Sequence, residues 1–127
     1  MSITLHLAWP DSKLHSHNTG HWRGKHAVVA SARSVAKFHA SSVKVAGMPW
    51  EYATVSLHFR MPDRRNRDLF NLCQSMKPSI DGIVDAGLIV DDSMDHLGIG
   101  TITWCHAKND PGVDVTIERL GDERKGK

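Results

Sequence analysis

Five polar side chains in the middle of the sequence have the types and spacing to carry chemistry together. Asp68 and Asn71 open an apolar-periodic segment, Lys77 follows farther along it, and Asp91-Asp92 stand after a short apolar run. Carboxylates from two separate elements can converge on Mg²⁺, a hard cation that prefers oxygen ligands and keeps several waters. A metal held in this way activates water and stabilises a departing oxygen, while a lysine offsets developing charge. These residues therefore indicate metal-assisted phosphodiester cleavage.

Each acidic position also has a structural interpretation. Asp68 can be the N-cap of a helix, with its carboxylate accepting a bond from the Asn71 amide. Asp91-Asp92 before Ser93 can form a turn in which the side chains bond to their own backbone. The spacing leaves these alternatives open.

Charge is unevenly distributed along the sequence. Residues 1–67 hold ten Lys/Arg and three acidic residues, whereas residues 68–107 hold one Lys and six Asp. A basic segment suits a polyanionic partner, and an Asp-rich segment with little counter-charge suits a hard cation. An ordinary solvated surface is the alternative. His15, His17 and His21 could ligate Zn²⁺, but no nearby Cys completes a four-ligand set.

The elements that must position these residues can be predicted from periodicity. Alternation predicts strands over 3–8 and 52–60, and the 26–40 segment predicts an amphipathic helix with Val28, Ala32, Val35 and Phe38 on its apolar face. Helical spacing continues from Leu69 to Ala86, with a kink or a fresh helix start near Pro78 and a stop at Gly87. Two further strands, 97–107 and 113–120, flank the turn sequence 109–112, which predicts an antiparallel hairpin.

Length and composition limit the class of protein. With 127 residues, 14.1 kDa and 40% hydrophobic residues, the chain fits a single domain over 1–127, in which we expect 121–127 to be frayed. No apolar run approaches the roughly 18 residues of a membrane span, and the first residues lack the features of a signal peptide. We therefore expect a cytoplasmic protein with Cys73 and Cys105 as thiols and no membrane partner.

The same residues resemble the RusA-like Holliday junction resolvases, especially phage-borne members. The likeness lies in the Arg-rich approach 64–67, the helix opening 68–71, Lys77-Pro78, Asp81-Gly82, Asp85-Ala86-Gly87 and Asp91-Asp92-Ser93. It covers roughly residues 52–95 well and 3–40 loosely. The resemblance implies an α/β (α+β) homodimer with a mixed four-stranded sheet packed by two main helices. It also implies Mg²⁺-dependent cutting of four-way DNA junctions in recombination and repair, in a bacterial cell, from a phage or prophage gene.

The resemblance also implies roles for particular residues. Asp68, Asp91 and Asp92 would hold the metal, Asp92 being the stronger candidate of its pair, and Asn71 and Lys77 would complete the catalytic group. Mn²⁺ could substitute for Mg²⁺, and no small-molecule cofactor is implied. Two identical subunits would place two metal sites on opposing strands of a two-fold symmetric junction.

Phe70 stands where the family has a second Asp. Three interpretations follow: a site with fewer protein ligands and more waters, a junction-binding protein without cleavage, or a replacement ligand from the later acidic segment. The candidate replacements are Asp81, Asp85, Asp95 and His96. Phe70 itself could stack on an unpaired base or, as the more ordinary interpretation, contact the core.

Contact with DNA is expected from a set of basic side chains that would neutralise phosphates and make binding fall with salt. This set consists of Arg60, Arg64, Arg65 and Arg67, together with Arg23 and Lys25 in the early loop.

Overall fold

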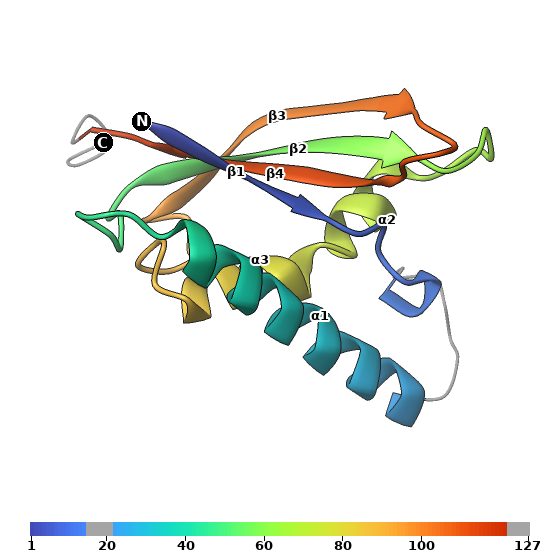
Figure 1. Cartoon of the computed structure of the whole chain (residues 1–127), viewed down its shortest axis with the longest axis horizontal. Helices are drawn as coiled ribbons and strands as arrows, with labels where there is room; N and C mark the ends of the chain where they lie inside the picture. The colour runs from blue at the N-terminus through green and yellow to red at the C-terminus, as the bar shows by residue number, and fades with distance from the viewer. Residues whose placement is uncertain (15–21, 122–127) are drawn as a thin grey trace.

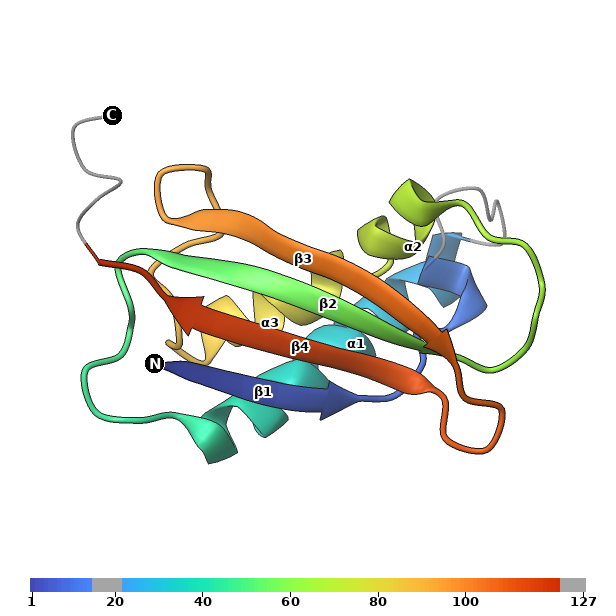
Figure 2. The same cartoon turned by 90° about the horizontal axis from the view of Figure 1, so that it is seen from above.

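The fold is built on one four-stranded sheet. The computed structural model describes residues 1–14 and 22–121. The strands are β1 (Ser2–Leu7), β2 (Ala53–Met61), β3 (Leu97–His106) and β4 (Gly112–Arg119), in the spatial order β1-β4-β2-β3 (Figure 2). β2 runs parallel to β3 and antiparallel to β4, which also pairs antiparallel with β1. The mixed four-stranded sheet expected for this chain is therefore present.

The helices lie together on one face of this sheet (Figure 1). They are α1 (Trp22–Val43), the short α2 (Leu69–Gln74) and α3 (Lys77–Asp85), and a 3-10 turn η1 (Ser12–Leu14) follows β1. This gives a two-layer α+β domain whose two longer helices are α1 and α3. Among the described residues, no helix combines the length and apolar character needed to cross a membrane.

Alternating side chains along the strands form the core. Leu57 and Phe59 of β2 and Val115 of β4 are buried, whereas the polar residues between them face away from the helices. Alternation of this kind is typical of a sheet with one covered face and one solvated face.

The predicted hairpin between β3 and β4 is wrong. Both strands exist and run in opposite directions, but β2 lies between them: Phe59 pairs with Trp104 on one side and with Val113 on the other. The connection 107–111 crosses the end of β2 instead of making a tight turn. Five residues are enough to span two strand spacings of about 4.8 Å each.

The buried face of α1 also differs from the prediction. Phe38 is 74% exposed and Val35 is exposed as well, while Ala36 and Ala40 are completely buried. The reason is the close approach of α3, where a Cβ on Gly82 would lie 2.3 Å from the backbone oxygen of Arg33. Only small residues fit at this crossing, so the large apolar side chains of α1 lie outside it.

The break near Pro78 and the stop at Gly87 follow the prediction. α2 ends before Ser75, and α3 starts afresh with Pro78 in its first turn, where its missing N–H is not needed. Gly87 has a φ of +84°, a conformation in which glycine carries no Cβ penalty. The chain then turns back towards the sheet.

The buried residues Leu88 and Ile89 place the acidic loop that follows. Ile89 forms a parallel bridge with Trp50, supported by the Trp50 amide donating to the Leu88 carbonyl (2.9 Å) and the Val90 amide donating to the Trp50 carbonyl (3.0 Å). This short bridge holds the start of the 91–95 loop against the body of the domain.

Candidate active site

Lys77 and Asp92 meet at the start of α3. The Lys77 ammonium donates a hydrogen bond to Asp92 Oδ2 and another, of 2.7 Å, to Asp81 Oδ1. Asp81 lies one helical turn beyond Lys77, where i and i+4 side chains are neighbours, while Asp92 arrives from the loop after the Trp50 bridge. Two residues 15 positions apart in the sequence are thus brought into direct contact.

The charges of this cluster stabilise one another. Hydrogen bonding to Asp81 and then to Asp92 raises the pKa of Lys77 above its usual value, and the bond from Lys77 lowers the pKa of Asp92. The ammonium and the Asp92 carboxylate therefore both stay ionised at neutral pH. This combination can present a positive charge to a phosphate and a carboxylate to a cation.

A mainly apolar hollow of about 500 Å³ adjoins the cluster. Lys77 and Asp92 line it, together with Gln74 from α2 and apolar residues from β2, β3 and the helices. It lies between the α2–α3 segment and the sheet, at the β3 end.

Asp68 is the N-cap of α2. Its Oδ1 accepts a hydrogen bond of 3.0 Å from the Asn71 amide, so the structural interpretation of Asp68 is confirmed. The Asp68 side chain is nevertheless exposed, and one oxygen is not used by this cap bond. Capping and a second role are compatible, because a carboxylate has several acceptor sites.

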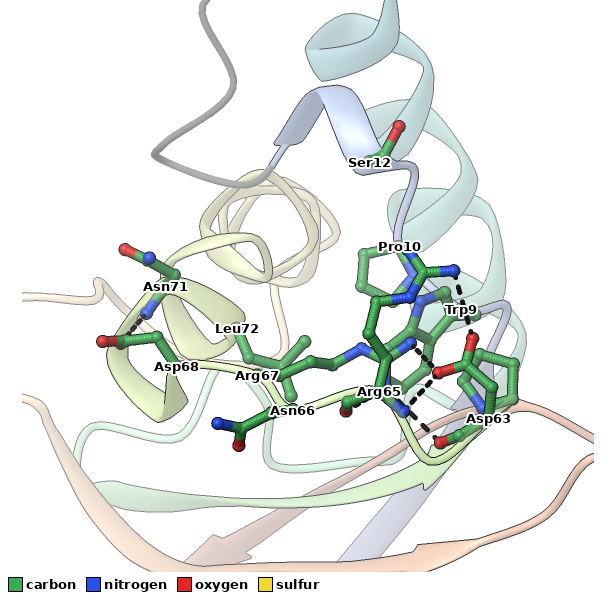
Figure 3. A pocket seen from close by; sticks show the side chains of 11 residues that line it. Trp9, Pro10, Ser12, Asp63, Arg65, Asn66, Arg67, Asp68, Asn71 and Leu72 are labelled. Carbon is green, nitrogen blue, oxygen red and sulfur yellow. Dashed lines mark hydrogen bonds and ion pairs between the residues drawn. The ribbon is translucent and has the colours of Figure 1, made fainter.

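A second hollow, of about 360 Å³, lies beside Asp68. Figure 3 shows Arg67 extended along it from Leu72 towards Trp9, with dashed bonds to Asp63. The Arg67 guanidinium lies 5.2 Å from the centre of the Trp9 ring and donates to Asp63 Oδ1 at 2.9 Å, and its side chain is only 13% exposed. Arg67 is therefore largely committed to holding the 62–68 connection against the domain.

Arg64 and Arg65 of the same connection are exposed. Arg65 keeps only a long ion pair of 3.5 Å with Asp63 through its side chain, while its backbone amide donates to the same carboxylate at 2.9 Å. These bonds, led by the Arg65 amide, lower the pKa of Asp63. The Arg65 guanidinium thus lies in the same hollow as Asp68, while Arg64 lines another hollow with His106 and Lys108.

The remaining predicted basic residues are placed differently. Arg60 lies on the sheet face away from the helices, paired with Asp110 at 3.2 Å and Asp114 at 3.4 Å, and its buried Nε has no hydrogen-bond partner among the described residues. Arg23 is in the first turn of α1, but its side chain lies outside the described part, as do His15, His17 and His21. Lys25 is half-buried in the same turn.

Two of the four residues expected to replace a missing ligand are engaged elsewhere. Arg33 of α1 binds Asp85 through two bonds, of 2.5 and 2.8 Å, and His96 Nδ1 lies 2.8 Å from the Glu51 carbonyl. Asp81 shares the Lys77 ammonium with Asp92, and Asp95 is exposed. Phe70 is 82% exposed, so its interpretation as a core contact is wrong.

The described carboxylates offer a cation at most one or two ligands in any one place. Within residues 1–14 and 22–121, no group of three or more His, Cys, Asp or Glu side chains could hold a metal ion. Asp68 and Asp92 line different hollows, and Asp91 is exposed beside Asp92. Because Mg²⁺ is often bound through one or two carboxylates with waters in its other positions, these residues can still serve it.

Two features of the site were not predicted. The contact of Asp81 with Lys77 had a detectable signal in their i, i+4 spacing. The packing of Arg67 on Trp9 joins residues 58 positions apart and had no local signal.

The chain matches no family model, and no curated protein was found to be similar to it.

Proposed function

We propose that this protein is a structure-selective endodeoxyribonuclease that cuts four-way DNA junctions with Mg²⁺, as the RusA-like resemblance implies. The observation that carries the proposal is the direct contact of Lys77 with Asp92. The resemblance assigns both to one catalytic group, although they are far apart in the sequence. The exposed carboxylate of Asp68 and the exposed Arg65 in the same hollow further support the proposal.

In this proposal, particular residues would bind the metal and stabilise charge. Asp92, with Asp91 beside it, and Asp68, which lines a separate hollow, would each provide carboxylate oxygens for Mg²⁺, which supplies an activated water and charge neutralisation when bound. Lys77, kept protonated by its raised pKa, would offset negative charge that develops on the phosphate. Asn71 holds Asp68 in place through its backbone amide.

Binding of DNA would come from the exposed arginines. Arg65 can neutralise a phosphate next to Asp68, and the exposed Arg64 can neutralise another. Each such contact makes binding weaker as salt rises. A homodimer would present two such sites, which suits the two-fold symmetry of a four-way junction.

A second candidate is a junction-binding protein of the same kind without cleavage. The exposed Phe70 favours it, because this residue stands where the family has a carboxylate, and the described residues contain no three-carboxylate group. The two candidates differ only in chemistry and can be separated by one experiment.

The experiment measures nicking of a labelled four-way junction and of a linear duplex of equal length, with and without Mg²⁺. We expect paired, symmetric nicks in the junction from the wild-type protein, and none from Asp92→Asn or from Asp68→Asn, which keeps the helix cap. Glu51→Gln, an exposed change outside the site, should cut like the wild type. Circular dichroism of each variant shows that it is folded.

Other outcomes decide between the candidates. Junction binding without nicks, with cutting gained in Phe70→Asp, supports the binding protein. Junctions that bind no better than the linear duplex at equal salt would refute both.

A further inference from the structure

The largest exposed apolar side chains of the sheet lie on β3. Ile99 is 72% exposed and Trp104 is 57% exposed, although both lie on the helix-covered face of the sheet. Their register shows this, since Ile99 pairs with the buried Val55 and Trp104 with the completely buried Phe59. β3 packs mainly against β2, and Figure 2 shows α1 beneath β1 and β4, on the side away from β3. Under this strand the α2–α3 segment leaves a hollow instead of packing closely.

The apolar hollow described above lies beneath the same strand. Leu57, Ile80, Cys73 and Ile102 are among its walls. Phe70 lies three residues before Cys73 on α2, so the two share one side of the helix. We call Phe70, Ile99, Ile102, Trp104 and the walls of this hollow the β3 surface. It contains both protruding side chains and a recess, as a surface that packs against its own copy requires.

The free edge of β3 has only one of the usual protections against association, a bulge. No strand pairs with this edge among the described residues, and from Leu97 to Cys105 the strand has no charged residue and no proline. Exposed edges are normally protected by charge, by proline or by a bulge. Here a bulge opposite Ser56, where the Thr101 amide donates to Ser56 Oγ, interrupts any continuous ladder. A contact with another molecule is therefore better made through the exposed side chains of β3 than through the backbone of its free edge.

We propose that the β3 surface is the interface on which a second copy of this chain packs about a two-fold axis. The area supports this occupant: Phe70, Ile99 and Trp104 alone expose roughly 400 Å² of side chain, at about 150–250 Å² for a whole aromatic group. A stable interface needs about 800 Å² per partner, and the walls of the hollow supply further apolar area. In a two-fold contact the same patch serves both partners, so one apolar surface covers the other.

This inference gives an interface to the homodimer named in the proposed function. It rests on the proposed function only for the role of the dimer in cutting junctions. Lys77 and Asp92 line the hollow, so the interface would adjoin the candidate active site. Self-association is measured without DNA or metal. Its failure is therefore distinguishable from a failure to cut junctions.

The first test is sedimentation of the full-length protein from about 1 µM upward. We expect a species of twice 14.1 kDa at high concentration. Ile99→Lys and Trp104→Lys should each weaken the association at least tenfold. Phe38→Lys is the matched control, because Phe38 is equally exposed but lies on α1, outside the surface. A wild-type protein that stays monomeric, or a dimer broken by Phe38→Lys and not by the β3 changes, would overturn the proposal.

The two cysteines give a second test in the unaltered protein. Cys73 lines the hollow, whereas Cys105 pairs with Arg60 on the opposite face of the sheet. Dimer formation should slow alkylation of Cys73 at least tenfold as protein concentration rises, with Cys105 unchanged, as peptide mass spectrometry can measure. Parallel slowing of both thiols, or no slowing of either in a dimer, would place the interface elsewhere.

Discussion

Replacing Gly82 with alanine tests the crossing of α1 and α3 that supports Lys77. A methyl group at this position would lie 2.3 Å from the Arg33 backbone oxygen and 2.9 Å from the Lys37 backbone nitrogen. Ordinary carbon–oxygen contacts are about 3.3 Å or longer, so α1 would have to move away by roughly 1 Å. Both neighbouring atoms belong to the backbone and cannot rotate aside.

Two opposing effects set the magnitude. Alanine is favoured over glycine in a helix interior by about 1 kcal/mol. Overpacking costs about 1–3 kcal/mol, and a clash with backbone places Gly82→Ala at the upper end. We therefore expect the free energy of unfolding to fall by about 2 kcal/mol, or roughly 8 °C in Tm at about 4 °C per kcal/mol for a chain of this size.

Urea unfolding followed by far-UV circular dichroism measures this change. Ser34→Ala is the control, because Ser34 is exposed on α1 and its replacement introduces alanine without a clash. A Gly82→Ala protein as stable as the wild type, with Ser34→Ala unchanged or slightly more stable, would show that the helices do not need this close approach.

Two further changes test the surroundings of the site. Asp68→Ala should lower the free energy of unfolding by about 1 kcal/mol and Asp68→Asn by a few tenths, since asparagine also caps helices; equal losses in urea unfolding would contradict the cap. Arg33 lowers the pKa of Asp85 in the folded protein. The stabilisation from this ion pair is therefore fully present above the unfolded Asp pKa of about 3.9, and it is lost as pH falls through the lower pKa of Asp85 in the folded state. Arg33→Gln should therefore raise the Asp85 pKa in an NMR titration and weaken the loss of stability below about pH 4; an unchanged titration would exclude the pair.

Local signals were sufficient for most elements of the fold. The alternation in β1 and β2, Pro78 at a helix start and Gly87 at its end each depend on neighbouring residues and were predicted from the sequence. The insertion of β2 between β3 and β4 was not. The 107–111 segment shows that the chain reverses direction, but only the α2–α3 crossover, which makes β3 parallel to β2, determines which strands become neighbours.

Side-chain exposure was predicted less well, for a related reason. Phe38 fits the apolar periodicity of α1, yet the crossing at Gly82 admits only Ala36 and Ala40 there. Phe70 was interpreted as an ordinary core contact and is 82% exposed. At the site, residue types and the family resemblance grouped Lys77 with Asp92, but spacing does not show that the Trp50 bridge returns the chain to the start of α3 and brings the two into contact.

The central position of β4 determines when the sheet can form during synthesis. β4 bonds to β1 along one edge and to β2 along the other, and the Arg119 amide still donates to the Met1 carbonyl at 2.9 Å. A nascent chain that has not yet released residues 112–119 from the ribosome therefore has β1 and β2 without the strand that joins them. The complete four-stranded sheet can therefore form only after residue 119 has been synthesised, and until then the apolar sides of β1 and β2 lack the strand that joins them.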